Sequence, residues 1–301
     1  CCPTRPAASS ASCDARAARI GLLSRSDPGF HPGVRTVDIP TSSGDEEPYF
    51  YVEDAVGLVS EAQMDTLEFH LWGSRVDTLE QPDMMVFDLD PDKGLGLEQV
   101  RRGVRDLKGI LDELGLKSFL KTSGGKGYHV VLPFQPAASW DAFHDFARRI
   151  AQVMAEKWPD RYTSNVRLAK RTGKVFIDWM RNGRGATSIA PYSLRARSGA
   201  RVSMPLSWEE LDEAAPDAFT MDDALARIEA ERAMLASSLP ADLLDAYKKT
   251  AARTGGVAVG RLQGSNCGVC RMAIEGGRLI DMKGQGNVAP CPQCGRLLIL
   301  E

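Results

Sequence analysis

The sequence has no apolar run that approaches the roughly 20 residues of a membrane-spanning helix. It also has no hydrophobic secretory region after its first residues. We therefore expect a cytoplasmic protein without a membrane partner. Internal repeats are absent as well, so one large or two modest globular domains should account for the 301 residues.

The chain also lacks a strong net charge, which is −3, but its charges are unevenly distributed. Residues 45–100 contain 15 acidic residues against Arg75 and Lys93, whereas residues 101–201 contain 20 Lys and Arg against 8 acids. An acidic block can hold cations and a basic block can hold phosphates, a combination typical of enzymes that act on nucleotides or nucleic acid. Two complementary surface faces of opposite sign are the alternative.

Hydrophobic periodicity predicts an α/β fold of the α+β kind, with flanking helices around mixed sheets. Strands are expected at 34–40, 48–52, 67–72, 84–91, 117–122, 128–134 and 175–179, and helices at 54–64, 97–114 and 139–158. The pattern predicts that the first two strands form a hairpin. The apolar stripe of the third helix is expected to consist of Phe143, Phe146, Ile150, Val153 and Trp158.

The composition also predicts four segments along the chain. Residues 1–28 are rich in Ala, Ser and Arg without a clear period, so we expect them to be disordered or poorly packed. The main α/β domain is expected over 29–215. Helices at 221–239 and 241–253 predict a helical connector over 216–254, and residues 255–301 should form short strands and turns around four cysteines.

The segment Met84–Pro91 is an apolar strand that ends in two acids. Because side chains alternate along a strand, Asp88 and Asp90 should point the same way, while Phe87 and Leu89 point into the core. Two neighbouring carboxylates repel each other unless a cation lies between them, and oxygen ligands suit Mg²⁺ or Mn²⁺. The pattern indicates a divalent-metal site, with an acidic strand end that faces water as the alternative.

A third carboxylate, Asp178, lies between apolar residues in the strand predicted at 175–179, as Asp88 does in its strand. Three carboxylates on neighbouring strands can bind two divalent ions, which together hold the attacking and leaving oxygens of a phosphoryl transfer. An ion pair with Arg181, one turn further along, is the alternative for Asp178.

A glycine-rich turn lies between two predicted strands in the segment Lys121–His129, KTSGGKGYH. Glycines let backbone N–H groups approach an anion, and Lys126 adds positive charge. Ser123 and His129 flank the turn, within reach of a phosphate bound there. The turn is not a Walker A loop, because a strand follows it where that loop leads into a helix. A hairpin turn with a solvated lysine is the alternative.

Four arginines among small residues follow Asp178, in the segment 181–197, RNGRGATSIAPYSLRAR. Arginine side chains match the geometry of phosphate oxygens. The segment is therefore a candidate phosphate-binding loop, and a solvated basic loop is the alternative.

These motifs, in the order DxD, SGGKGxH, a strand with one Asp, RNxRGAT and PYSxRAR, resemble the polymerase (primase-like) domain of bacterial DNA ligase D. That family belongs to the archaeo-eukaryotic primase superfamily. The resemblance extends over about residues 30–228 and includes FHPGVRTVDIP and PLSWEEL. It implies a primase-polymerase-like fold for the domain over 29–215, in a bacterial, nucleoid-associated protein of non-homologous end joining.

The resemblance further implies a two-metal nucleotidyltransferase that adds ribonucleotides or deoxyribonucleotides to a primer 3′-hydroxyl. Asp88, Asp90 and Asp178 would hold two Mn²⁺ or Mg²⁺ ions. The nucleotide would be bound by His70, Ser123, Lys126, His129, Arg181 and Arg195. The implied partners are NTP or dNTP, a DNA primer-template or DNA ends, and end-joining proteins such as Ku and a ligase module.

Residues 1–28 do not resemble the basic and aromatic N-terminal segment with which the family grips the 5′-phosphate of the downstream strand. We therefore expect weak or non-specific DNA affinity and a weakened polymerase activity.

The C-terminal cysteines form two CxxC pairs, Cys267/Cys270 and Cys291/Cys294, separated by 20 residues. This spacing predicts a Cys₄ zinc ribbon over 255–301 that binds one structural Zn²⁺. The segment resembles the C-terminus of bacterial C4-type zinc-ribbon proteins, which implies binding to nucleic acid or protein.

Two other functions are compatible with these motifs. In one, the chain is a catalytically weak nucleic-acid or protein adaptor that acts through its ribbon. In the other, it is a two-metal phosphodiesterase, which would need a water-activating base that the sequence does not reveal.

Overall fold

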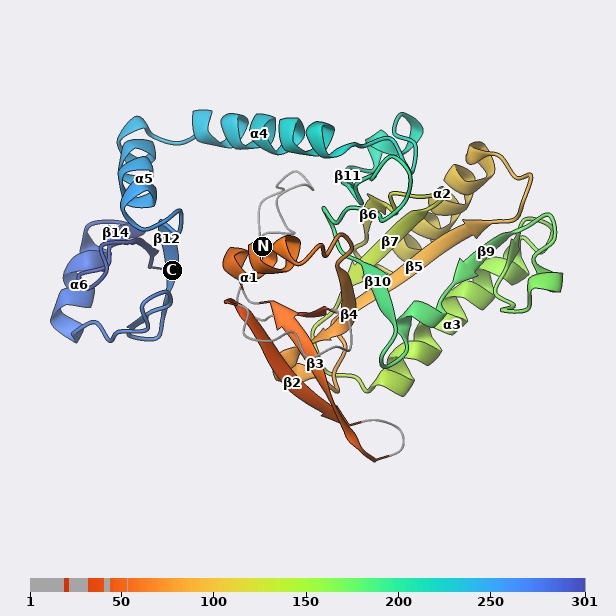
Figure 1. Cartoon of the computed structure of the whole chain (residues 1–301), viewed down its shortest axis with the longest axis horizontal. Coiled ribbons are helices and arrows are strands. Elements are labelled where there is room, and N and C mark those ends of the chain that lie inside the picture. The colour runs from red at the N-terminus through yellow and green to blue at the C-terminus, as the bar shows by residue number, and fades with distance from the viewer. Residues whose placement is uncertain (1–18, 22–31, 41–43, 53, 301) are drawn as a thin grey trace. The chain divides into compact units, whose positions relative to one another are not determined.

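The structure is a computed structural model that describes residues 19–21, 32–40, 44–52 and 54–300. The chain divides into two compact units, Cys1–Leu225 and Ala226–Glu301 (Figure 1). In the described part of the chain, none of the helices combines the length and apolar character that crossing a membrane requires.

The first unit is built on a six-stranded mixed sheet. Its strand order is β11 (Pro205–Leu206), β6 (Phe119–Thr122), β7 (Tyr128–Pro133), β5 (Met84–Pro91), β9 (Val175–Asp178) and β8 (Tyr162–Thr163). All neighbouring strands are antiparallel except β8 and β9. The predicted α/β class with mixed sheets is confirmed.

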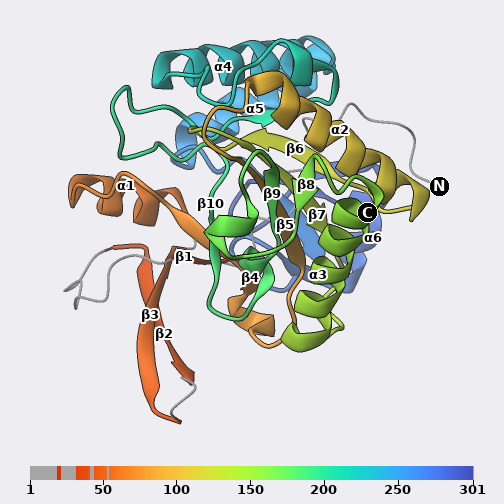
Figure 2. The same cartoon turned by 90° about the vertical axis from the view of Figure 1, so that its right-hand side faces the viewer.

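Two helices, α2 (Leu97–Glu113) and α3 (Trp140–Lys157), cover one face of this sheet (Figure 2). The helix α2 forms because Val100, Val104, Leu107 and Leu111 recur at the helical period, and all four are buried. They pack into one hydrophobic cluster that also contains the core-facing side of β5. The helix ends at Gly115, whose φ of 69° is the left-handed conformation typical of that position.

A second sheet of the first unit has five strands. Their order is β10 (Thr187–Ile189), β4 (His70–Arg75), β1 (Arg19–Gly21), β3 (Glu46–Val52) and β2 (Val34–Pro40). The strands β2 and β3 form the predicted hairpin and extend as a long ribbon in both views. The short helix α1 (Ala55–Gln63) follows the hairpin, and Asp54 caps it by accepting a hydrogen bond from the Gly57 N–H.

Three expectations from the sequence need correction. Disorder over 1–28 is wrong at residues 19–21, because they form β1 and pair with β3 and β4; the remainder of that segment lies outside the described residues. In α3, Phe146 and Val153 are exposed, since the helix buries Ala147 and Ala151 instead. The strand predicted at 67–72 begins only at His70.

The second unit contains most of α4 (Met221–Ser237), then α5 (Ala241–Arg253) and a small four-stranded sheet. The sheet order is β13 (Asn266–Cys267), β12 (Val259–Gln263), β15 (Leu297–Ile299) and β14 (Val288–Pro290). The sequence did not predict α6 (Gly276–Gly284), which lies between β13 and β14. Arg253 of α5 donates to the Gly295 carbonyl at 2.9 Å, which joins the helix to the cysteine-bearing turns.

Candidate active site

A row of four polar side chains crosses the six-stranded sheet. Lys121 of β6 lies opposite His129 of β7, His129 opposite Asp88 of β5, and Asp88 opposite Asp178 of β9. Residues directly opposite one another in an antiparallel ladder share a face of the sheet. Asp90, two residues after Asp88 in the same strand, shares that face as well. The strand register therefore brings together the three carboxylates that the sequence singled out.

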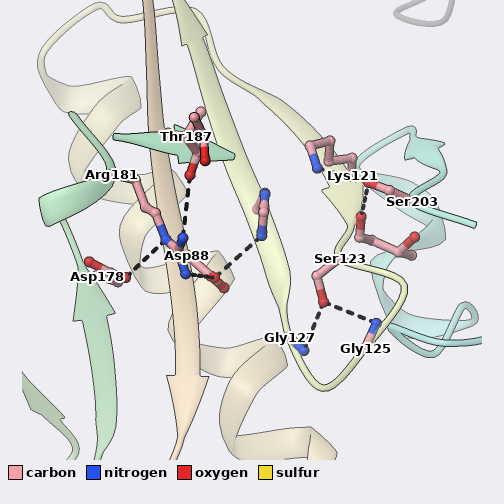
Figure 3. A network of polar contacts seen from close by, with 12 residues as sticks. Asp88, Lys121, Ser123, Gly125, Gly127, Asp178, Arg181, Thr187 and Ser203 are labelled. Atoms are coloured by element: carbon pink, nitrogen blue, oxygen red, sulfur yellow. Dashed lines mark hydrogen bonds and ion pairs between the residues drawn. The ribbon is translucent and has the colours of Figure 1, made fainter. Parts of the chain in front are cut away.

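Two basic side chains, His129 and Arg181, contact the carboxylates of this row, and Figure 3 shows Arg181 between Asp88 and Asp178. Burial lowers the pKa of His129, so its contact with Asp88 does not require a charged ring. The His129 Nε2 atom lies 3.4 Å from Asp88 Oδ2. The Arg181 Nε atom lies 3.2 Å from Asp178 Oδ2, and its Nη2 atom lies 4.0 Å from Asp88 Oδ2. Arg181 follows β9 in the short helix η4 (Met180–Asn182), so its guanidinium reaches back between two strands. The predicted ion pair of Asp178 with Arg181 is present.

The three carboxylates differ in the direction of their pKa shifts. Burial, followed by repulsion from Asp88 and Asp178, raises the pKa of Asp90 to about 6. Burial also raises the pKa of Asp178, although Arg181 opposes the shift. Burial acts to raise the pKa of Asp88 too, but His129, Arg181 and Lys121 outweigh it and lower the pKa. Such divergent shifts within a small cluster are common at functional sites.

The three aspartates of the site, Asp88, Asp90 and Asp178, are chemically suited to divalent cations. Their side chains offer only carboxylate oxygens, the ligands that Mg²⁺ and Mn²⁺ prefer. Their mutual repulsion, expressed in the raised pKa of Asp90, is what a bound cation would relieve. The aspartates are less tightly gathered than the cysteines described below, which in the described residues form the one cluster with all ligand atoms within 4.8 Å of one another.

The glycine-rich turn between β6 and β7 lies beside this row. The Ser123 Oγ atom accepts hydrogen bonds from Gly125 N at 3.2 Å and Gly127 N at 3.3 Å, so the side chain shapes the turn. A Cβ atom at Gly127 would lie 2.5 Å from the Leu89 carbonyl oxygen of β5, which explains the need for glycine there. Lys126 is exposed at the tip of the turn.

The last two predicted nucleotide contacts, His70 and Arg195, approach from the second sheet and the loop that follows β10. Arg195 Nη1 donates to the Ser123 carbonyl at 3.3 Å, which places the arginine against the glycine-rich turn. His70 begins β4, whose register partner in β10 is Ile189. Both side chains contact the carboxylate of Glu68. The structure therefore connects His70, Arg195 and the turn into one constellation.

Sequence reasoning missed Lys121 as a member of the row. This lysine is 4% exposed, and its Nζ atom donates to Ser203 Oγ at 2.8 Å. Burial lowers its pKa to about 7, an effect that the charge of Asp88 opposes and that of Arg195 reinforces. Its position opposite His129 depends on the register of three strands, which no local pattern in the sequence displays.

It also missed the buried side chain of Asn182. The Asn182 Oδ1 atom accepts from Val86 N at 2.7 Å, and its Nδ2 donates to the Val86 carbonyl at 2.8 Å. Because β9 pairs with β5 only from Asp88 onwards, the amide takes over the backbone hydrogen bonds at Val86. It thereby holds η4, and with it Arg181, against the end of the row.

The second unit brings the four predicted zinc-binding cysteines together. The Sγ atoms of Cys267 and Cys294 lie 3.9 Å apart, as do those of Cys270 and Cys291. A tetrahedral site with Zn–S bonds of about 2.3 Å separates its sulfurs by about 3.8 Å. The observed sulfur separations therefore fit a closed Cys₄ zinc site.

Comparisons with known proteins agree with this constellation. A family described as "LigD, primase-polymerase domain" matches residues 22–235. The multifunctional non-homologous end joining protein LigD of Pseudomonas aeruginosa is 42% identical over 181 residues, which are 60% of this chain and 21% of that protein. The corresponding LigD protein of Mycobacterium tuberculosis is 35% identical over 213 residues, 67% of this chain and 28% of that protein.

A solved structure supports the same relationship. The polymerase domain of Mycobacterium tuberculosis ligase D, in complex with DNA, superposes with a TM-score of 0.63 at 28% sequence identity. The match covers 71% of this chain and 81% of that domain. The chain thus spans only a quarter or so of the full-length LigD proteins but most of their polymerase domain. It belongs to the LigD primase-polymerase domain family.

Proposed function

We propose that this chain is a two-metal nucleotidyltransferase that adds ribonucleotides or deoxyribonucleotides to a primer 3′-hydroxyl in DNA end joining. The observation that carries the proposal is the register that sets Asp88 directly opposite Asp178, with Asp90 on the same face. Membership of the LigD primase-polymerase family supports the same reaction class.

In this proposal Asp88, Asp90 and Asp178 hold two Mn²⁺ or Mg²⁺ ions. When bound, the ions supply positive charge at the attacking hydroxyl and at the phosphate being attacked. Without them, Arg181 forms an ion pair with Asp178 at 3.2 Å and the His129 Nε2 atom contacts Asp88 at 3.4 Å, so both carboxylates have partners. Cations bound to the same carboxylates would displace Arg181 from them, and its guanidinium would then be available to a nucleotide phosphate.

The nucleotide triphosphate lies against the glycine-rich turn in this proposal. Ser123 uses its oxygen to shape the turn, so its hydroxyl hydrogen is the part that remains for a phosphate. His129, Lys126, Arg195 and His70 complete the binding groups. Lys121 lies buried beside His129 with its pKa lowered to about 7, so an anion bound at this position would favour its protonated form. Fixed donors of this kind stabilise the charge that develops in phosphoryl transfer.

The DNA partners are a primer-template or broken ends, with Ku and a ligase module as further end-joining partners. One Zn²⁺ held by Cys267, Cys270, Cys291 and Cys294 has a structural role, because all four positions are protein ligands and none is left open for chemistry.

Primer extension tests the proposal. The unmutated protein should incorporate ribonucleotides at a primer end in the presence of Mn²⁺, and Asp90→Ala should reduce the rate by at least about a thousandfold, because it removes a shared metal ligand. Asp112→Ala is the matched control, since Asp112 is an exposed carboxylate on α2, away from the row, and should leave the rate unchanged. No incorporation by the unmutated protein would reject the proposal.

The gathered cysteines favour a second candidate function, a nucleic-acid or protein adaptor that acts through the ribbon. It requires binding to a partner without nucleotide incorporation. Primer extension combined with a DNA-binding measurement separates the two functions. An adaptor would bind DNA without incorporating nucleotides, whereas a nucleotidyltransferase would do both and would lose incorporation in Asp90→Ala.

A further inference from the structure

Glu68 joins two of the predicted nucleotide-binding residues through a single carboxylate. Its Oε2 atom lies 2.8 Å from His70 Nε2, and its Oε1 atom lies 3.2 Å from Arg195 Nε. Oε1 also accepts a hydrogen bond from the Ala196 backbone N–H at 2.7 Å. These partners come from β4 and from the loop after β10, which lie more than 120 residues apart in the chain.

The partners of Glu68 stabilise the ionised form of its carboxylate. Burial acts to raise its pKa, but the His70 hydrogen bond, the Ala196 N–H and Arg195 outweigh burial and lower the pKa. The side chains of Glu68 and His70 are half-buried, so these contacts are partly shielded from water. An ionised carboxylate only accepts hydrogen bonds, so His70 must carry a proton on Nε2, and its Nδ1 atom is turned away from Glu68.

Arg195 continues the connection from Glu68 to the glycine-rich turn. Its Nη1 atom donates to the Ser123 carbonyl at 3.3 Å. A Cβ atom on Gly124 would lie 2.7 Å from the Arg195 Cγ atom, which shows how closely the arginine stem lies over the turn. The ion-pair contact of Nε with Glu68 and the hydrogen bond from Nη1 to the Ser123 carbonyl together restrict the position of the guanidinium.

We propose that Glu68 is a positioning residue for nucleotide binding, whose carboxylate fixes the ring of His70 and the guanidinium of Arg195 around the triphosphate. This inference rests on the proposed function. It adds a residue that does not itself bind the nucleotide, because Glu68 acts only through His70 and Arg195. A pre-oriented cation loses less conformational entropy on binding phosphate than a free side chain does.

A purely structural role for Glu68 is the competing explanation, since the carboxylate also anchors the loop through Ala196. The same loop has a second anchor, Ser193 Oγ, which accepts from Phe69 N at 2.8 Å. Ser193 is 5% exposed, and within the described residues its hydrogen bonds go to partners other than His70 and Arg195. The two anchors therefore allow loop attachment to be separated from the orientation of the binding groups.

The experiment compares Glu68→Gln with Ser193→Ala in primer extension with Mn²⁺ and ATP. Glu68→Gln keeps an oxygen for the Ala196 N–H but loses the charge, so KM for ATP should rise about tenfold with a smaller change in kcat and in melting temperature. Ser193→Ala should lower the melting temperature and leave KM unchanged. Glu68→Asp, which keeps the charge but shortens the side chain, should restore part of the affinity.

Equilibrium binding of labelled ATP with Mn²⁺ is measured in parallel, because it does not depend on turnover. If the unmutated protein bound ATP without incorporating it, the proposed reaction would be rejected. Weaker ATP binding by Glu68→Gln would support the positioning role in that case as well. Equal KM and equal ATP affinity in Glu68→Gln and the unmutated protein would overturn the inference. A rise of KM in Ser193→Ala equal to that in Glu68→Gln would overturn it too, in favour of loop attachment alone.

Discussion

The carboxylate of Asp90 destabilises the folded protein when it is ionised, because it is buried beside two other carboxylates. Its pKa is raised to about 6 in the folded protein by burial and by Asp88 and Asp178, against a value of 3.8 for an unperturbed side chain. Between these two pH values the folded state holds a proton that the unfolded state has released. Raising the pH through this window therefore favours unfolding, and the stabilisation present below pH 4 is lost by about pH 6.

We accordingly predict that Asp90→Asn stabilises the protein in the absence of added Mn²⁺ or Mg²⁺. The amide has nearly the same shape and no charge, so the gain should be on the order of 2–3 kcal/mol at pH 7.5 and should vanish near pH 4. Urea denaturation at the two pH values measures it, with Asp112→Asn as the exposed control. A gain that is independent of pH would contradict the electrostatic origin.

The same residues show what the sequence could and could not predict. The alternation in Met84–Pro91 was sufficient to place Asp88 and Asp90 on one face, because that pattern is local. The roles of Lys121 and Glu68 were not predicted. The role of Lys121 depends on the register of β6 against β7, and that of Glu68 depends on a loop that is distant in the sequence. Polar residues acquire such roles only through partners that local periodicity does not identify.

At the scale of elements, η4 is attached to β5 by one side chain. The Asn182 amide satisfies both the N–H and the carbonyl of Val86, and its Nδ2 atom also donates to the Trp179 carbonyl at 2.9 Å. Asn182 is 1% exposed, so water is excluded from these groups. Loss of the amide would leave buried backbone groups without partners, which costs more than the hydrogen bonds themselves contribute.

Asn182→Ala should therefore lower the free energy of unfolding by about 2–4 kcal/mol. It should also reduce nucleotide incorporation at temperatures where the protein remains folded, because Arg181 in the same element loses its support. Asn165→Ala is the control: that exposed side chain accepts only from Arg167 N in the hydrogen bonds described for it, and its loss should cost less than about 1 kcal/mol. Equal losses in the two variants would argue against a bracing role for Asn182.

Helices were predicted well where large side chains mark the buried face, as in α2. In α3 the prediction failed at Phe146 and Val153, because the helix approaches the sheet through Ala147 and Ala151. Small residues permit close packing but contribute little to a hydrophobic pattern. The helix α6 was not predicted because it begins with Gly276 and Gly277, which are poor helix formers. Its position therefore depends more on tertiary contacts than on helix propensity.

At the scale of the whole molecule, the two units have separate hydrophobic cores. The core of the first unit contains about two dozen buried side chains from its six-stranded sheet and from α2 and α3. The core of the second unit has seven buried residues, two of which are the zinc-binding candidates Cys267 and Cys291. A core this small rarely sustains a fold without a metal or disulfide, so the stability of the second unit should depend on zinc while that of the first should not.

The prediction that follows concerns Cys291→Ser. The unmutated chain should contain about one zinc ion, as a Cys₄ site requires, and the variant should release it. Hydrogen exchange should then show loss of protection in β12, β15 and α6, whereas β5, β7 and α2 should stay protected. Because the aspartate row and the glycine-rich turn belong entirely to the first unit, ATP binding with Mn²⁺ should be retained.

Cys13→Ser provides the matched control, because Cys13 belongs to neither of the two CxxC pairs in the sequence and its replacement should leave the zinc content unchanged. The comparison also tests whether the ribbon contributes to catalysis at a distance. If Cys291→Ser lost ATP binding while β5 and β7 kept their protection from exchange, folding of the first unit could not explain the loss. Zinc would then act on the nucleotide site itself, and the independence inferred from the two cores would be wrong.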